Sequence, residues 1–155
     1  MSLYLLLKTL HILSATLLFG TGLGSAYYAL RAWRSGQLQV IATTFRHLVT
    51  ADWLFIATTA VFQPFSGLAL AKLAGWPLSQ AWLLWSAGLF VFAGLCWLPV
   101  LWLQIRVRDM AAEALATGGE LPERANRYMR IWFVLGWPAF IAFIVIFWLM
   151  VAKPL

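Results

Sequence analysis

Four long apolar runs constrain the fold of this chain more than any other feature. They cover approximately residues 3–30, 48–74, 81–105 and 131–152. Each reaches or exceeds the roughly 20 residues that an α-helix needs to cross a hydrocarbon core about 30 Å thick. Backbone polar groups in lipid must be satisfied within their own segment, so the runs are expected to be helices. The sequence therefore predicts an all-α fold, a four-transmembrane-helix bundle that forms a single integral membrane domain over residues 1–155.

The composition agrees with this class of protein. Of the 155 residues, 63% are apolar and only 10% are charged, whereas a soluble chain of this length needs far more polar surface. The first run contains "GSA" at 24–26, which resembles a signal-peptide cleavage site. It is nevertheless longer than a typical signal-peptide core and carries its charges inside the run, so we expect it to be retained. The single cysteine, Cys96, excludes a disulfide framework and a cysteine-based zinc site.

Lysine and arginine are distributed unevenly between the two sides of the predicted bundle. Eight of the eleven lie around the first and third connections, whereas the second connection, "AGWPLSQ", carries no charge. Basic residues accumulate on the cytoplasmic side of membrane proteins. We therefore expect both termini on the periplasmic side of a bacterial inner membrane. The net charge of +6 then reflects topology, and the expected partner is the lipid bilayer and not nucleic acid. The eight residues are Arg31, Arg34, Arg46, Arg106, Arg108, Arg124, Arg127 and Arg130, and the other three are Lys8, Lys72 and Lys153.

The third connection, residues 106–130, is the only long polar segment. Its pattern predicts that the third helix extends to about Ala116, stops at Gly118 and Gly119, and is followed by a new helix after Pro122. Its mixed charges are typical of a solvated cytoplasmic elbow.

Polar residues inside the runs are the best indications of function, because each is costly in lipid unless it has a partner. Spacings of three, four and seven place several of them on one face of each helix, and we expect these faces to point inward. "QPFSG" at 63–67 indicates a proline kink in the second helix. The inward residues are Tyr4, Lys8, His11, Ser14, Thr21, Gly22 and Ser25 in the first helix, Asp52, Thr59, Gln63 and Ser66 in the second, and Ser86 in the third.

His11 is the strongest candidate for a functional residue. It lies roughly 12 Å inside the outer end of its helix, at 1.5 Å per residue. One interpretation is a hydrogen bond between helices, to Gln63 or to a hydroxyl group. The other is a metal-ligand role as the axial ligand of haem b, since a porphyrin needs an imidazole, nearby glycine, aromatic walls and a cation for its propionates. Lys8, one turn outward, is the candidate cation, or it extends to the outer interface.

Two further features enter this prediction. Gly20 and Gly24 form a GxxxG pattern, which allows close approach of a neighbouring helix, the more common use, or of a flat ligand. The ten tryptophans exceed what two interfacial belts require, so some are expected to face the bundle interior or a ligand.

Asp52 and His47 lie near the cytoplasmic side of the second run. Asp52 is interpreted as the ion-pair partner of Arg106, Arg31 or Arg46, with a proton-relay carboxylate as the alternative. His47, beside Arg46, is expected to be a residue at headgroup level.

The chain resembles a known family over nearly its whole length. The segments "KTLHILSATLLFGTGLGSAYYALRAWRSG", "ADWLFIATTAVFQPFSGLAL", "GLCWLPVLWLQIRVRDMA" and "RYMRIWFVLGWPAFIAFIVIFWLMVAKP" are similar to an uncharacterised family of small bacterial integral membrane proteins, a domain of unknown function. More distantly, "LHI", "GLAL", "WL" and "GWPAF" resemble the HemJ-type protoporphyrinogen oxidases and the copper-resistance D membrane proteins.

The distant resemblance implies a haem b ligand at His11. It also implies an essential lysine near the start of the third helix, where this chain has Ser86. That difference argues against protoporphyrinogen oxidase activity, although Lys72 lies at a comparable membrane level. Methionines are isolated in the sequence, so a copper site is not expected.

The sequence therefore predicts a haem-binding membrane bundle with a redox or electron-transfer role and a site that includes His11, Lys8, Gly20, Gly24, Gln63, Lys72 and Ser86. The alternative is a cofactor-free accessory or assembly subunit, in which a helix of a partner protein or of a second copy contacts Gly20 and Gly24.

Overall fold

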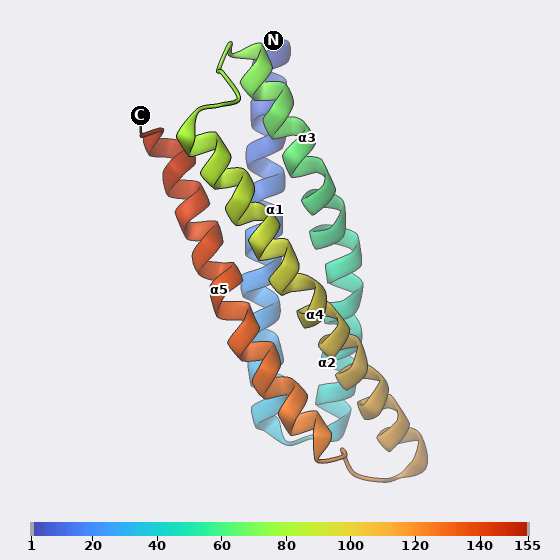
Figure 1. Ribbon diagram of the computed structural model, residues 1–155. Helices are drawn as coiled ribbons and strands as arrows, with labels where there is room; N and C mark the ends of the chain where they lie inside the picture. Colours follow the sequence, from blue (N-terminus) through green and yellow to red (C-terminus); the bar gives the residue numbers. More distant parts are fainter. Residues whose placement is uncertain (1, 155) are drawn as a thin grey trace.

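The computed structural model describes residues 2–154, and within that range the chain is helical except at its turns. Four helical segments are long and apolar enough to cross a membrane (Figure 1). The second of them is one continuous helix made of three parts. The elements are α1 (Leu3–Ser35), α2 (Leu38–Ala51), η1 (Asp52–Ala57), α3 (Thr58–Leu73), α4 (Ala81–Thr117) and α5 (Arg124–Ala152). The predicted all-α fold with four membrane-length helices is confirmed.

The ends of the helices follow glycine and proline. Gly118 has φ +65°, the left-handed conformation that commonly ends a helix, and its N–H bonds to the last turn of α4. The next helix begins at Arg124, two residues after Pro122. The predicted stop and restart in the third connection are therefore confirmed.

The prediction of a long first connection between residues 30 and 48 is wrong. Helix α1 continues to Ser35, and only Gly36 and Gln37 separate it from α2. The segment contains many polar residues, and its apolar residues, which recur with the period of a helix, were not recognised as one helix face. That face packs against α4. These residues are Ile41, Phe45, Leu48 and Val49, and all four are buried.

The second membrane helix contains a π-helical segment, Asp52–Ala57, that the sequence did not predict. Helix α3 continues through Pro64, the position at which a kink was expected. Pro64 removes one backbone donor, but the flanking helix is maintained. The irregular part of this helix lies instead two turns before the proline, where a π segment re-aims the side chains that follow it.

The two ends of the bundle are packed differently. At one end an apolar cluster joins α1, α2, α4 and α5, with Phe45 and Val107 fully buried in it. Toward the other end the bundle consists of two helix pairs, α1 with α3 and α4 with α5, and α3 and α4 make very few contacts although they are consecutive. Phe19 of α1 stacks on Phe140 of α5 and meets Phe147 of α5 edge to face, at ring-centroid distances of 5.1 and 5.3 Å. Few other contacts join α1 to α5.

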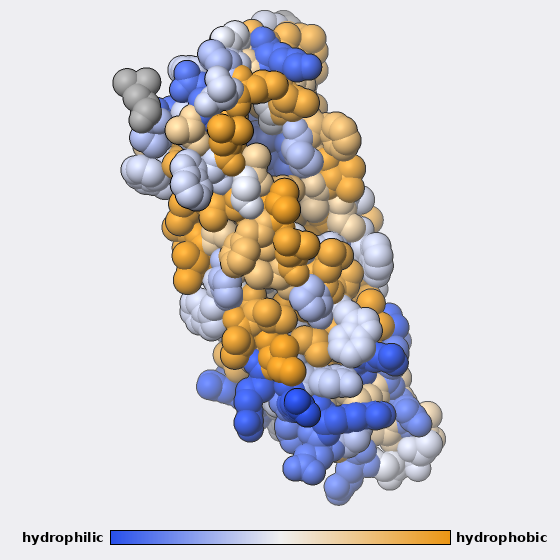
Figure 2. All heavy atoms as spheres, viewed as in Figure 1, coloured by the Kyte–Doolittle hydropathy of each residue, from blue (hydrophilic) through white to orange (hydrophobic). Residues whose placement is uncertain are grey.

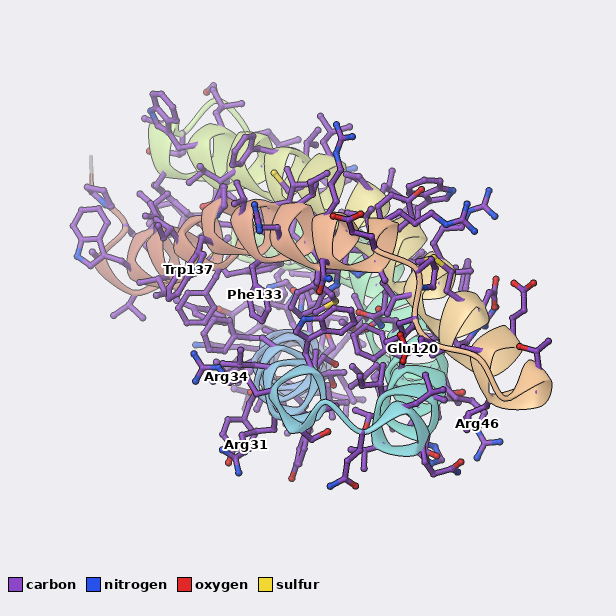
Figure 3. All side chains as sticks on the ribbon, turned by 90° about the horizontal axis from the view of Figure 1, so that it is seen from below. Arg31, Arg34, Arg46, Glu120, Phe133 and Trp137 are labelled. Carbon is purple, nitrogen blue, oxygen red and sulfur yellow. The ribbon has the colours of Figure 1, made fainter. Side chains whose placement is uncertain are left out.

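Charge also distinguishes the two ends. Both chain termini lie at the loosely packed end, which we call the terminal end (Figure 1). Arg31, Arg34 and Arg46 lie at the opposite end, together with Glu120 (Figure 3). Hydrophilic side chains gather there in the space-filling view, below a predominantly hydrophobic middle (Figure 2). We call this the basic end.

Candidate functional site

Four polar residues join α1 to α3 in the terminal half of the bundle, and we call them the α1–α3 polar cluster: His11, Ser14, Gln63 and Ser66. Nδ1 of His11 lies 2.7 Å from Oγ of Ser66. The Gln63 amide donates to the backbone oxygen of His11, at 2.9 Å, and to Oγ of Ser14, at 2.5 Å. Both hydrogens of that amide group are therefore used.

Helical spacing explains why these side chains meet. Residues three or four apart lie on the same face of a helix, which holds for His11 with Ser14 and for Gln63 with Ser66. Ser14, Gln63 and Ser66 are each less than a tenth exposed, and His11 is half-buried. The predicted inward orientation of Gln63 and Ser66 is confirmed. The contact of His11 with a hydroxyl group is the hydrogen-bonded interpretation that the sequence allowed.

The hydrogen bonds of Ser66 bear on which nitrogen of the His11 ring carries the proton. A serine hydroxyl has one hydrogen, and Oγ of Ser66 lies 2.8 Å from the backbone oxygen of Phe62, to which it donates. With that hydrogen used, Oγ is free to accept from Nδ1–H of His11, and the roles of these two atoms depend on the tautomer of the ring. The bond to Phe62 favours the tautomer with hydrogen on Nδ1, in which Nε2 keeps its lone pair.

Gly67 makes room for the His11 ring on α3. A Cβ atom at this position would lie 3.3 Å from Cε1 of His11 and 4.0 Å from Nε2. Gly67 is the only glycine within the described helices whose added Cβ would come within 4 Å of another helix. The lack of a side chain at Gly67 therefore allows the imidazole to lie directly against α3.

The face that carries His11 is only partly covered. On α1, no residue between Leu3 and Leu13 is buried, and the two that point most inward besides His11, Tyr4 and Leu7, are half-buried. Hydrophilic atoms are visible in a recess between hydrophobic side chains near the terminal end (Figure 2). In the tautomer with hydrogen on Nδ1, the imidazole has a lone pair on Nε2 that is able to accept a hydrogen bond or coordinate a metal ion.

Lys8 is not on the inward face, contrary to the predicted stripe. It is exposed, and its Nζ lies 5.8 Å from the centre of the Tyr4 ring. Gly22 is also exposed. The residues of α1 that face inward are at positions 4, 7, 11, 14 and 18, an average spacing of about 3.5 residues. Position 8 does not belong to this series and lies next to it on the helix surface. The long side chain of Lys8 extends along the helix surface, as lysine does near a membrane interface.

The remaining predicted site residues lie apart from the α1–α3 polar cluster. Ser86 is buried, but its hydroxyl donates to the backbone oxygen of Trp82 in its own helix, at 2.7 Å. Lys72 is exposed near the end of α3. Gly20 and Gly24 have no atom within 4 Å of an added Cβ, so no helix of this chain is closely packed on the GxxxG pattern.

Asp52 has a different partner from the predicted arginine, and the ion-pair interpretation is wrong. Its Oδ2 accepts a hydrogen bond from Nε2 of Gln104, at 2.9 Å, and Oε1 of Gln104 accepts from Nε1 of Trp132, at 3.1 Å. All three side chains are 5% exposed or less. This chain of hydrogen bonds joins η1, α4 and α5 inside the bundle.

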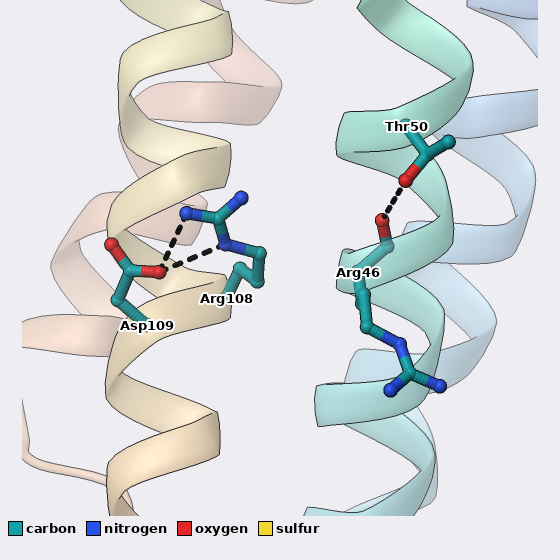
Figure 4. A network of polar contacts seen from close by, with 4 residues as sticks. All are labelled: Arg46, Thr50, Arg108 and Asp109. Carbon is teal, nitrogen blue, oxygen red and sulfur yellow. Dashed lines mark hydrogen bonds and ion pairs between the residues drawn. The ribbon is translucent and has the colours of Figure 1, made fainter.

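The arginines predicted as partners of Asp52 lie on the surface of the bundle. Arg31, Arg46 and Arg106 are exposed, and the guanidinium of Arg106 lies 5.3 Å from the Trp102 ring centre. Among the described residues the ion pair is Arg108 with its neighbour Asp109, at 2.8 Å, while the Arg46 side chain extends away from its helix (Figure 4). For charged groups at the basic end, exposure to solvent costs less free energy than burial inside the bundle.

Sequence reasoning missed Gln104, because it lies at the end of the third apolar run beside arginines. The signal that identifies it is the spacing from Gln104 to Val107 and Ala111, which are fully buried on the same face of α4. His47 is exposed near the basic end, in agreement with a residue at headgroup level.

The expectation for the tryptophans is met in part. Trp82 and Trp132 are buried in the bundle, whereas most of the others are exposed where lipid would surround them. The indole N–H of Trp97, on α4, is buried and has no hydrogen-bond partner among the described residues.

Within residues 2–154, no three His, Cys, Asp or Glu side chains are grouped so that they could hold a metal ion.

The fold and the buried polar groups define an integral membrane helical protein. A family model described as "Predicted integral membrane protein (DUF2269)" matches residues 5–154, and the chain belongs to that family. No curated protein and no solved structure matches the chain. The distant resemblance to the HemJ-type oxidases and the copper-resistance D proteins is not confirmed by these comparisons.

Proposed function

We propose that this membrane protein binds haem b in the terminal half of the bundle, with Nε2 of His11 as an axial ligand of the iron. The observation that carries the proposal is the 2.7 Å contact of Nδ1 of His11 with Oγ of Ser66, at a position where Gly67 places no side chain against the ring. Metal-bound histidines usually donate their other ring N–H to a fixed acceptor, which orients the ring and makes it a stronger ligand. Ser66 would be such an acceptor for Nδ1, and in that tautomer Nε2 keeps its lone pair.

The surroundings of His11 fit this group. Gly67 keeps a side chain away from the imidazole edge, and His11 itself is only half-buried. Lys8 lies on the same helix one turn closer to its N-terminus, and its flexible side chain is long enough to neutralise a propionate at the interface. Since Lys72 lies apart from this cluster, a second protein ligand would be a histidine of a second copy of the chain.

A haem held in this way supplies one-electron redox chemistry, and the role proposed for the protein is electron transfer or a membrane oxidoreductase reaction. The chain itself would orient the imidazole through Ser66 and fix the distance between α1 and α3 through Gln63. The charge difference between the two ends supports a place in the bacterial inner membrane with the basic end cytoplasmic. The site would then lie in the periplasmic half of the bilayer.

The test is an absorption spectrum of the protein, expressed with ample haem and purified in mild detergent. Wild-type protein should show a Soret band, and His11→Ala should lose it or convert it to that of a weakly held five-coordinate haem. His47→Ala is the matched control, because it removes the other histidine of the chain from an exposed position. Colourless wild-type protein would contradict the proposal.

A second candidate is a cofactor-free accessory or assembly subunit. It is favoured by the free space at Gly20 and Gly24, where no other part of this chain lies within 4 Å of an added Cβ. Small residues at such spacing allow a helix of another protein to approach closely. Colourless wild-type protein together with loss of a co-purifying membrane protein in Gly20→Leu would favour this candidate.

A further inference from the structure

A hollow opens at the basic end, between the end of α1 and the beginning of α5. Its volume is about 800 Å³. Trp33 lines it on α1, and Arg124, Arg127, Met129, Arg130 and Phe133 line it on α5. The two helices make few contacts with each other.

The hollow carries an excess of positive charge. Arg124, Arg127 and Arg130 are spaced by three residues and lie on neighbouring parts of one face of α5. Glu123 is the one acidic residue of the lining, so three positive charges and one negative leave a net charge of +2. None of the three arginines forms an ion pair among the described residues. Nε of Arg124 donates to Sδ of Met110 on α4, at 3.3 Å, whereas Arg127 and Arg130 are exposed and have no such contact.

The wall beside these charges is apolar. Phe133 follows Arg130 by one turn toward the middle of the bundle, and Trp33 faces it from α1. Trp137, one turn further along α5, is 64% exposed. In the view from the basic end, Phe133 lies between α5 and α1, with Trp137 beside α5 and Arg34 beside α1 (Figure 3). The surface therefore changes from cationic to aromatic at the level where headgroups meet acyl chains.

We propose that this hollow binds an anionic phospholipid, with its phosphodiester at Arg127 and Arg130 and an acyl chain along Phe133 and Trp137. Guanidinium groups bind phosphate oxygens through two parallel hydrogen bonds. Basic hollows between membrane helices on the cytoplasmic side suit acidic headgroups. A free phosphate ion would use the arginines alone and would leave the aromatic wall without a partner, so the lipid is the occupant that uses both. This site is separate from the α1–α3 polar cluster and does not depend on haem.

The test measures lipid retention by native mass spectrometry of the full-length protein in mild detergent, with phosphatidylglycerol or phosphatidylcholine added at equal concentration. Wild-type protein should retain phosphatidylglycerol preferentially. Removal of a guanidinium should weaken retention about fivefold for each arginine, so R127Q/R130Q should bind the two lipids nearly equally. Both arginines are exposed, and an unchanged melting temperature in detergent would verify that the double variant is folded.

The matched control is R31Q/R46Q, which removes two exposed arginines from the same end but outside the hollow. It should keep the wild-type preference. Equal loss in both double variants would show a general effect of surface charge and would overturn the proposal. Equal retention of the two lipids by wild-type protein would do the same. A third arm adds inorganic phosphate at matched ionic strength, and full displacement of the lipid by phosphate would assign the site to the free anion instead.

Discussion

Nδ1 of His11 and Oγ of Ser66 lie 2.7 Å apart and connect α1 to α3 in the half of the bundle where these two helices pack as a pair. The hydroxyl of Ser66 donates a hydrogen bond to the backbone oxygen of Phe62. This bond favours the tautomer with hydrogen on Nδ1, in which Nε2 is available as a ligand. The proposal for this site depends on the hydrogen bond between His11 and Ser66, which mutation of Ser66 tests directly.

Ser66→Ala should remove the acceptor for the Nδ1 proton. A hydrogen bond between membrane helices contributes about 0.5 to 2 kcal/mol, so the melting temperature in detergent should fall modestly. In haem-loaded protein the reduction potential should rise, because a less basic imidazole stabilises ferric iron less. Ser86→Ala is the control, since Ser86 is equally buried but bonds only within its own helix. Identical potentials in the two variants would argue against His11 as the ligand.

Gly67→Ala should displace the His11 ring, because the new Cβ would lie 3.3 Å from Cε1. The expected result is lower thermal stability or weaker haem retention. Gly88→Ala, at a helical glycine with nothing within 4 Å of the added Cβ, should be neutral or stabilising, because alanine favours the helix by about 0.5 to 1 kcal/mol. A Gly67→Ala protein as stable as Gly88→Ala, with an unchanged spectrum, would show that the close contact at α3 is unimportant.

Gln104→Leu should destabilise the basic half of the bundle. It would leave the Asp52 carboxyl group and the Trp132 N–H buried without their partner, at a cost of about 1 to 3 kcal/mol for each unsatisfied group. Asp52→Asn should cost much less, since an asparagine oxygen still accepts from Gln104. Thermal unfolding of the two variants compares them directly. If Asp52→Asn were the more damaging, a charged partner for Asp52 would have to be reconsidered.

Reporter fusions test the orientation. A reporter active only in the periplasm should function when fused after the last residue and be inactive when fused at Gly119, because eight of the eleven Lys and Arg residues lie on the side of the first and third connections. A reporter that is active at Gly119 and silent at the C-terminus would reverse the orientation and move His11 to the cytoplasmic half.

Much of this architecture was accessible from the sequence, because its determinants are local. The length of an apolar run is enough to predict a membrane-spanning helix, and Gly118 and Pro122 mark the ends of α4 and α5 through their own backbone preferences. Helical spacing also predicted that Gln63 and Ser66 face inward.

The parts that could not be predicted depend on partners distant in the chain. Whether Asp52 meets an arginine or Gln104 is decided by the rotation of α4 against η1, which no local pattern specifies. The π segment at Asp52–Ala57 shifts that rotation further. Lys8 was predicted to face inward because spacings of three and of four residues both place side chains near one face of a helix, so the sequence alone does not separate Lys8 from His11. The position of α3 decides that His11 is the inward residue.

The most direct test of the central claim is the Soret absorption of purified wild-type protein compared with that of His11→Ala, both expressed with excess haem and matched for protein concentration. The account predicts a haem b spectrum in the wild type that is lost or strongly altered in His11→Ala and preserved in His47→Ala. Wild-type protein without a Soret band, or a His11→Ala spectrum identical to the wild type, would contradict it.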